Sequence, residues 1–332
     1  MAEGTSSPEE LPPHVILGMR LEGIFMPHSR KQRADVYSKS KRFVHYTSAD
    51  NALKIIKTKR LWMRSTTCMA DYSEVEHGYQ MLVSFFSDEK RRKSFTDALD
   101  ICAPGAALEA LTLFEQWWAH IRTNSYVASI SEHEDGEDWH GRLSMWRAFG
   151  GTLAKVALVF RVPAYSGGAE QLNIVFSPVA YMNENEVHET FSTVIKNINA
   201  DVDFLRTLDR QIVVANVFHM LLTGVTCLKH EGFKEEREWR AIYVPKRASS
   251  PLMISSTEVV GGVPQIIYQI PLDRSTSPTL AELDLVSMFD RLIIGPSPYP
   301  WAMYDAFVDA LAKEGVPDAV KRVCVSGIPL RA

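Results

Sequence analysis

Cysteine is scarce in this sequence of 332 residues, and its placement excludes a cysteine-based metal site or disulfide framework. Zinc sites and small stapled domains need cysteines in close, regularly spaced pairs. The four cysteines are instead scattered, at Cys68, Cys102, Cys227 and Cys324. We therefore expect reduced thiols in a protein that folds without disulfide bonds or structural metal ions, and we expect a cytoplasmic location.

Long apolar runs are also missing. None of the apolar stretches is long enough to span a bilayer. The first thirteen residues carry Glu3, Glu9 and Glu10 among serine and proline, and they lack the basic start and apolar stretch of a secretory signal. We expect neither export nor membrane insertion, and no membrane partner.

The chain lacks an excess of positive charge and lacks several well-known catalytic motifs. Its formal net charge of -4 excludes the global basic field that non-specific nucleic-acid binders use, so any nucleic-acid contact must be local. GxSxG, HExxH and GxGxxG do not occur. The run from Gly295 to Pro298 lacks the spacing and lysine of a phosphate-binding loop, and it predicts a turn before a helix.

Apolar residues make up 46% of the chain, and their spacing alternates between strand and helix periods. We expect residues 1–37 to be largely disordered or irregular, and residues 38–332 to form one α+β domain with a helical insertion at about 74–122. Short β-prone runs predict strands at 42–47, 61–65, 125–131, 154–162, 173–181, 237–244, 265–270, 291–294 and 322–325. Helical spacing predicts helices after Ser48 and at 74–120, 143–149, 184–222 and 299–313.

The first candidate site is the sequence His45-Tyr46-Thr47, at the end of a predicted strand and before a helix capped by Ser48. Such a junction places a histidine and a hydroxyl near a helix N-terminus, where backbone N–H groups and the helix dipole favour an anion. The alternative is a histidine that only satisfies local structure.

The second candidate site is the charged run around Glu236, Glu238 and Arg240. In a strand these three side chains share one face, because side chains alternate. Two neighbouring carboxylates repel, which tends to raise the pKa of one, while an arginine can hold the other ionised. This arrangement suits acid/base chemistry or the stabilisation of a cation. A salt-bridged edge strand or an amphipathic helix is the alternative.

Two further features suggest ligands less directly. Trp146 lies on a predicted short helix and could stack on a nucleobase or nicotinamide ring, although aromatics at this spacing are usually core residues. The polar loop from Glu132 to His140 is dense in potential metal ligands. Its spacing matches no defined metal geometry, so a flexible solvated loop is the expected structure and no metal site is assigned.

The order of the short motifs resembles a widespread bacterial family of unknown function that is associated with the ADP-ribosyltransferase superfamily. The resemblance covers residues 43–331. It rests on Val44-His45-Tyr46-Thr47, Ala52-Leu53-Lys54-Ile55-Ile56, Leu61-Trp62-Met63-Arg64-Ser65, Ser129 and Ser131, Met145-Trp146, Phe233, Glu236-Arg237-Glu238-Trp239-Arg240 and Ile293-Ile294-Gly295-Pro296.

The resemblance implies a split sheet, mixed or antiparallel, with flanking helices and NAD as the substrate in a cleft. By position, His45 matches the first-strand residue that holds the adenine-side ribose, and Glu238 or Glu236 matches the catalytic glutamate. The family's segment after the second strand is represented here by Asp71 and Glu74. The remaining cofactor contacts implied by the resemblance are Tyr46, Thr47, Arg64, Ser65, Trp146 and Arg240.

The leading hypothesis is therefore a NAD-dependent ADP-ribosyltransferase that acts as a bacterial toxin or phage-defence effector on a protein or nucleic acid, with an antitoxin or regulatory partner. One alternative is a non-catalytic module that binds a nucleotide or partner in the same cleft. Another is a metal-dependent nuclease or other hydrolase that uses Glu236, Glu238 and Asp71. The helical region of residues 74–122 is the expected family-specific lobe for a target or partner.

Overall fold

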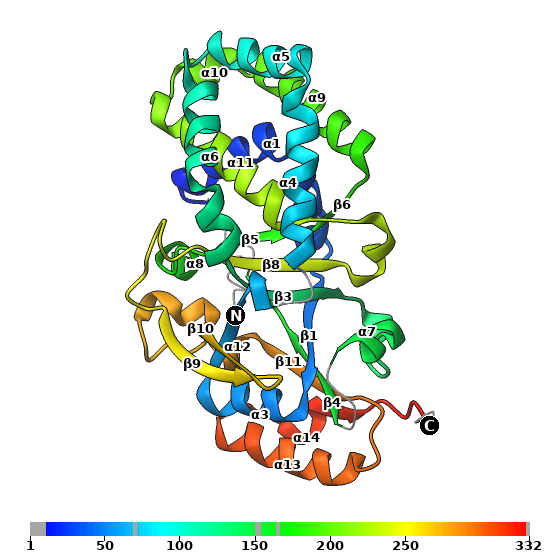
Figure 1. The fold of residues 1–332 in the computed structure, drawn as a ribbon. Coiled ribbons are helices and arrows are strands. Elements are labelled where there is room, and N and C mark those ends of the chain that lie inside the picture. The colour runs from blue at the N-terminus through cyan, green and yellow to red at the C-terminus, as the bar shows by residue number, and fades with distance from the viewer. Residues whose placement is uncertain (1–10, 69–71, 150–153, 164–166, 330–332) are drawn as a thin grey trace.

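The computed structural model describes residues 11–68, 72–149, 154–163 and 167–329. Figure 1 shows a lobe of packed helices above a lobe built on a twisted sheet. No helix in these ranges is both long enough and apolar enough to cross a membrane.

The sheet lobe is organised around ten strands. The main path runs β12-β11-β4-β1-β3-β2-β10-β9, and β8 joins β3 and carries β5. Neighbours are antiparallel apart from the parallel pair β11 and β12. This arrangement confirms the predicted α+β class with a mixed, mostly antiparallel sheet. The strands are β1 (Arg42–Ser48), β2 (Arg60–Ser65), β3 (Tyr126–His133), β4 (Lys155–Phe160), β5 (Val175–Pro178), β8 (Glu238–Tyr243), β9 (Ile254–Val260), β10 (Val263–Pro271), β11 (Phe289–Ile294) and β12 (Val323–Val325).

Helices cover the lower part of the sheet. Helix α3 (Ala49–Thr58) begins where Ser48 accepts a hydrogen bond from the Asn51 N–H at 3.3 Å, and it buries Ile55 and Ile56. Helix α13 (Pro300–Lys313) packs beside it and confirms the helix predicted at 299–313, which buries Phe307 and Leu311 but leaves Trp301 exposed. The shorter helices of this lobe are α7 (Leu143–Ala148), α8 (Gly167–Gln171), α12 (Leu285–Met288) and α14 (Ala319–Arg322).

The sheet forks between β1 and β2. Strand β1 pairs with the end of β3, up to Val44 opposite Ser131, whereas β2 pairs with its beginning, where Arg64 lies opposite Val127. Residues 128–130 of β3 therefore face neither strand on this side. Continuing the β1 register would pair Tyr46 with Ser129, but β1 instead follows β4 through residues 43–48. The fork leaves a gap in the middle of the sheet.

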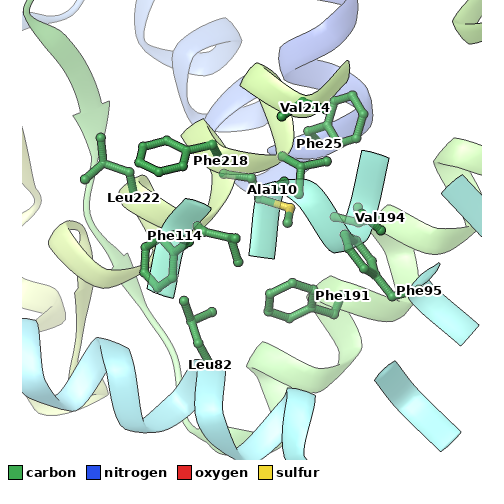
Figure 2. Packing of buried hydrophobic residues seen from close by; sticks show 14 of the residues in the cluster. Phe25, Leu82, Phe95, Ala110, Phe114, Phe191, Val194, Val214, Phe218 and Leu222 are labelled. Atoms are coloured by element: carbon green, nitrogen blue, oxygen red, sulfur yellow. The ribbon is translucent and has the colours of Figure 1, made fainter. Parts of the chain in front are cut away.

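The helical lobe combines three chain segments rather than one insertion. The predicted helices at 74–120 are present, but they pack against helices from residues 184–226 and from the N-terminal region around a shared apolar core (Figure 2). Hydrophobic burial joins the segments because each helix alone leaves an apolar face in water. The helices are α1 (Pro13–Phe25), α4 (Tyr72–Ser87), α5 (Glu89–Asp100), α6 (Ala106–Asn124), α9 (Glu184–Ala200), α10 (Val202–Arg206) and α11 (Arg210–Thr226).

The expectation of an irregular segment up to residue 37 is wrong for the residues from Pro13 onward. Helix α1 is followed directly by α2 (Pro27–Ser38), and each begins with a proline, which suits the first helical turn. Few residues of α2 are apolar, which hides its period, yet Phe25 and Val36 are fully buried against the rest of the protein. Tertiary contacts therefore stabilise helices that the local pattern does not reveal. Residues 1–10 lie outside the described part.

Most predicted strands are present within a few residues, and two were missed or shortened. Strand β9 was not predicted because it is an edge strand whose side chains are mostly exposed, so it lacks an apolar stripe. The predicted strand at 173–181 is split into β5 and the short β6 (Ala180–Tyr181). Strand β6 pairs in parallel with β7 (Leu228–Lys229), outside the main sheet.

Close packing in the helical lobe makes Gly78 a sensitive position. A Cβ atom at Gly78 would lie 2.8 Å from the backbone Cα and carbonyl oxygen of Val225 on α11. Gly78→Ala should therefore lower the free energy of unfolding by about 1–3 kcal/mol, because α4 and α11 would have to separate. Gly18→Ala is the matched control, since nothing lies within 4 Å of its added methyl and it sits inside α1. Chemical denaturation should show this control unchanged or stabilised by up to ~1 kcal/mol.

Candidate functional site

A cleft of about 250 Å³ opens at the fork of the sheet. It lies between β1 and β2, and the middle of β3 forms its floor. His45 and Glu238, the two principal residues of the sequence hypothesis, both line it. The other lining residues are Val44, Tyr46, Thr47, Asn51, Lys54, Ile55, Leu61, Trp62, Arg64, Val127, Ala128, Ser129, Ile130, Ser131, Met145, Phe149, Lys229, Glu236 and Val260.

The His45 side chain supplies a hydrogen-bond partner for a β3 carbonyl group at the fork. Its Nδ1 lies 3.0 Å from the carbonyl oxygen of Ser129. A carbonyl can only accept, so Nδ1 carries the hydrogen and the neutral ring keeps Nε2 as an acceptor. Burial of the half-buried imidazole lowers the pKa of His45, and the bond to Ser129 opposes this only in part. At neutral pH, His45 therefore offers an uncharged acceptor to the cleft.

The fork also leaves peptide groups without a strand partner. The N–H and C=O of one strand residue point to the same side, so the N–H of Ser129 faces the fork with its carbonyl. Tyr46 stands opposite Ser129 in the interrupted register, and its backbone groups would have completed that pair. The Ser129 hydroxyl also makes no hydrogen bond of regular geometry within the described residues. The cleft thus presents backbone donors and an acceptor beside a hydroxyl.

Glu238 stands at the centre of a buried ion cluster at the other side of the cleft. Arg240 donates to its carboxylate from Nε at 2.8 Å and from Nη2 at 3.1 Å. Lys229 Nζ lies 3.3 Å from Glu238, 2.7 Å from Glu236 and 2.9 Å from Glu74. Arg240 also bonds Glu74 at 2.5 Å. Three carboxylates therefore share two cations. The side chains of Glu238, Lys229 and Arg240 are almost fully buried, and those of Glu74 and Glu236 are slightly more exposed.

The cluster holds Glu238 as a permanent anion. Burial alone would raise the pKa of Glu238, but Arg240 and Lys229 outweigh it and lower the pKa to about 2, with help from the nearby Ser129 hydroxyl. Glu238 therefore corresponds to the carboxylate that the sequence hypothesis expects an arginine to hold ionised. The same carboxylates raise the pKa of Lys229 against the effect of burial. Glu238 can stabilise positive charge and accept hydrogen bonds, but it cannot act as a general acid near neutrality.

Glu236 joins the cluster although it does not lie on the strand with Glu238 and Arg240. Glu236 ends a 3₁₀ helix (Glu231–Glu236), and Arg237 has φ 47°, a left-handed conformation that turns the chain into β8. Only Glu238 and Arg240 share a strand face. The N–H of Glu238 donates to the Tyr181 hydroxyl at 2.9 Å, which fixes the first residue of β8.

Three residues of the sequence hypothesis do not line the cleft. Trp146 is 2% exposed and packs edge-on against Tyr46, with ring centroids 4.8 Å apart. A Cβ at Gly295 would lie 2.7 Å from its indole, so the ring is closely packed in the core and offers no stacking face. Ser65 is buried and shares a hydrogen bond with Thr67 at 2.7 Å. Arg240 lies behind Glu238, where it positions that carboxylate.

Sequence reasoning missed several residues that the fold brings to the cleft. Lys229 gave no signal, because its partners come from positions far away in the chain. Trp62 and Phe149 supply partly exposed aromatic rings, and the Lys54 ammonium lies 5.8 Å from the Trp62 ring centroid. Trp62 and Ser129 belong to the motifs that carry the family resemblance, and their membership of these motifs could have identified them as cleft residues. Asp71 lies outside the described residues.

The polar loop after β3 carries several ion pairs, and Glu134, Asp135 and Gly136 are exposed, as expected of a solvated loop. Arg42 pairs with Asp135 at 2.5 Å, with Asp138 at 2.8 Å and with Asp290 at 2.6 Å. Buried His133 contacts Asp138 at 2.9 Å. Within the described ranges, no group of three or more His, Cys, Asp or Glu side chains converges as metal ligands do. The carboxylates near the cleft point instead at Lys229 and Arg240.

Residues 145–241 match the model of a family described as a protein of unknown function, DUF2971. The match runs from α7 to β8, so it contains Lys229, Glu236, Glu238 and Arg240, whereas His45 and Glu74 lie outside it. It confirms the expected resemblance to a family of unknown function. No curated protein and no solved structure matches the chain.

Proposed function

We propose that this protein is a NAD-dependent ADP-ribosyltransferase that binds NAD in the fork of the sheet. The observation that carries the proposal is that His45 and the permanently ionised Glu238 line the same cleft. They lie beside peptide groups that the fork leaves without a strand partner. A forked sheet with a first-strand histidine and a late-strand glutamate is what the superfamily resemblance implies.

The charge of Glu238 suits the chemistry of glycosidic cleavage. When the bond between nicotinamide nitrogen and ribose C1′ breaks, its electron pair leaves with nicotinamide and positive charge develops on the sugar. A fixed carboxylate stabilises that charge and accepts a hydrogen bond from a ribose hydroxyl. The acceptor nucleophile then bonds to C1′ and loses its proton to solvent or to Glu236. Arg240 and Lys229 keep Glu238 ionised and oriented throughout.

The other lining groups match the uncharged parts of the substrate. His45 Nε2 can accept from a ribose hydroxyl, and the backbone groups of Tyr46 and Ser129 can pair with a carboxamide, which has both a donor and an acceptor. Trp62 and Phe149 are the aromatic candidates for contact with the nicotinamide ring in place of the buried Trp146. A volume of about 250 Å³ is smaller than typical whole-ligand pockets, so it suits the nicotinamide and its ribose while the adenine half lies outside.

The acceptor can approach from a second hollow. Glu238 also borders a polar cavity of about 510 Å³ on its other side, together with Tyr181, Glu186 and Glu189. An acceptor in this cavity would lie next to the residue that stabilises the sugar. We propose a protein or nucleic-acid acceptor, and a role as a bacterial toxin or phage-defence effector with a regulatory partner. That setting follows from the family resemblance.

The direct test is NAD turnover by the purified protein, with and without cell lysate, followed by mass spectrometry of protein and RNA for an ADP-ribose adduct. We expect nicotinamide release and an adduct that persists in the presence of a chelator. Neither nicotinamide release nor any adduct in lysate would contradict the proposal. Nucleic-acid cleavage that a chelator abolishes and that ignores NAD would support a nuclease instead.

A binding module without catalysis is the second candidate. The observation that favours it is the full pairing of Glu238 with Arg240 and Lys229, which also suits a purely structural anion. Such a module would bind a nucleotide with unchanged affinity after Glu238→Gln, and it would release no nicotinamide. Nicotinamide release by the wild-type protein, measured beside calorimetry with NAD, separates the two functions, because only the enzyme turns over the NAD that it binds.

The neutral form of His45 predicts how NAD binding depends on pH. Burial holds the pKa of His45 below its ordinary value of 6.5, so the acceptor at Nε2 persists at neutral and alkaline pH. NAD affinity should therefore stay constant from about pH 7 to 9 and weaken only at acidic pH below the ordinary histidine pKa, as the ring gains a proton. His45→Ala should bind NAD at least tenfold more weakly and lose this acid limb. His120→Ala, at an exposed site on α6, is the control. A wild-type acid limb that survives in His45→Ala would assign the titration to another group.

A further inference from the structure

A second and larger cavity, of about 1290 Å³, lies between the helical lobe and the sheet. Helices α1 and α11 form one wall, and residues of β4, β5 and β10 form the opposite wall. Its lining is mainly apolar: Leu11, Val15, Met19, Met26, Leu61, Ile130, Phe160, Val162, Leu172, Ile174, Val175, Phe176, Ala215, Ala241, Ile270, Leu272, Leu283 and Met288. The proposed ADP-ribosyltransferase chemistry does not use this space.

Helix α11 places a small residue, Ala215, at the wall of the cavity. Val213, Val214, Val217 and Phe218 are buried in the helical core, whereas Ala215 between them is exposed and lines the cavity. A methyl group at this place leaves room that a larger apolar side chain would fill. The apolar walls favour a ligand with a hydrocarbon body, because such a ligand removes both surfaces from water.

Arg247 supplies a cation at the edge of this apolar space. It follows β8 in a turn, and its guanidinium carbon lies 4.5 Å from the ring centroid of Phe218. The guanidinium has neither a hydrogen bond nor an ion pair in the part of the chain that the structure describes. Arg33, the other arginine of the lining, differs because its Nε lies 3.1 Å from Glu22. Arg247 is therefore an exposed arginine at the edge of the cavity, and its guanidinium has no carboxylate partner among the described residues.

The groups around Arg247 leave its charge uncompensated. Burial lowers the pKa of Arg247, and no carboxylate opposes this effect. His219, which also lines the cavity, has its pKa lowered to about 4 by burial and by Arg247 itself, so it is neutral near pH 7. Because Arg247 is exposed at the edge of the cavity, an anionic group there can reach its guanidinium and form charge-assisted hydrogen bonds with it.

We propose that this cavity binds an amphipathic small molecule, with its hydrocarbon chain between α1, α11 and the sheet and its anionic head group on Arg247. The lining also holds three carboxylates, of which Glu22 pairs with Arg33 at 3.1 Å and Glu170 lies 3.7 Å from His14, while Glu282 is exposed. The apolar walls, the large volume and the guanidinium of Arg247 together favour an anionic amphiphile. The head group is a carboxylate or a phosphate, which a guanidinium recognises through the same paired hydrogen bonds. Leu61 and Ile130 also line the cleft, so the two cavities share a wall.

The test is calorimetry of the full chain with laurate, dodecyl phosphate and dodecyltrimethylammonium, each below its micellar concentration. We expect the two anions to bind and the cation to bind at least tenfold more weakly. The stronger of the two anions identifies the head group. Arg247→Met should weaken anion binding at least tenfold, because it keeps an unbranched apolar stem and removes the charge. Lys246→Met, at the exposed neighbouring position, should leave binding unchanged.

A cavity-filling variant tests the apolar part separately. Ala215→Phe should abolish binding of both anions while circular dichroism and thermal unfolding show a folded protein. Equal binding of anions and the cation, equal effects of Arg247→Met and Lys246→Met, or no binding to the wild type would overturn the proposal. None of these outcomes depends on NAD turnover, so the proposal can fail while the proposed function stands.

Discussion

Glu238→Gln is expected to lower ADP-ribose transfer by about 10²- to 10³-fold, the usual loss when one electrostatic stabiliser of a developing charge is removed. The amide keeps the shape of the side chain but carries no negative charge for the sugar. Because Glu238 has its pKa held at about 2, the wild-type rate should not fall through titration of this group above about pH 4. The rate of nicotinamide release, measured at saturating NAD, reports the effect directly.

Two measurements separate this loss from misfolding. Glu74 and Glu236 still pair with Arg240 and Lys229 in the variant, so we expect it to fold and to bind NAD with a change smaller than the change in rate. Glu231→Gln removes an exposed carboxylate nearby and should keep full activity. A folded Glu238→Gln protein with unchanged turnover would exclude the catalytic role.

Arg240→Met is expected to lower the free energy of unfolding by about 3–5 kcal/mol, the largest stability effect that we predict for this protein. Arg240 is 1% exposed, and it binds Glu238, Glu74 and, at 2.7 Å, the carbonyl oxygen of Thr226. Methionine fills similar space but leaves Glu238 buried with Lys229 as its remaining cation. Urea denaturation of the variant measures the loss.

A double variant tests whether the loss of stability in Arg240→Met comes from the buried Glu238 carboxylate that loses its arginine partner. Adding Glu238→Leu to Arg240→Met removes the buried anion as well, and it should restore part of the lost stability. Arg161→Met is the control, because its side chain is 61% exposed in its pair with Asp290. We expect that control to change stability by less than about 1 kcal/mol. A control as destabilising as Arg240→Met would mean that burial of the ion cluster is not what matters.

Local pattern was a good guide where one residue and its near neighbours decide the outcome. The strand before Ser48, the cap itself and the strand face shared by Glu238 and Arg240 all follow from short-range rules, and the structure has them. The same rules did not reveal α1 and α2, whose stability comes from burial against distant segments. For Trp146 the local pattern favoured a core residue, which the structure has, whereas the cofactor contact implied by the resemblance is not at the cleft.

By itself, the sequence determined the α+β class, most of the strands and the residue types from which a site could be built. Those properties depend on the period of apolar residues and on local capping. The tertiary structure alone decided that the sheet forks after Val44, that His45 and Glu238 meet in that fork, and that Lys229 joins Glu74 to the cluster. The physical reason is that a strand ladder ends, and a buried charge finds its partners, through contacts between segments that are far apart in the chain.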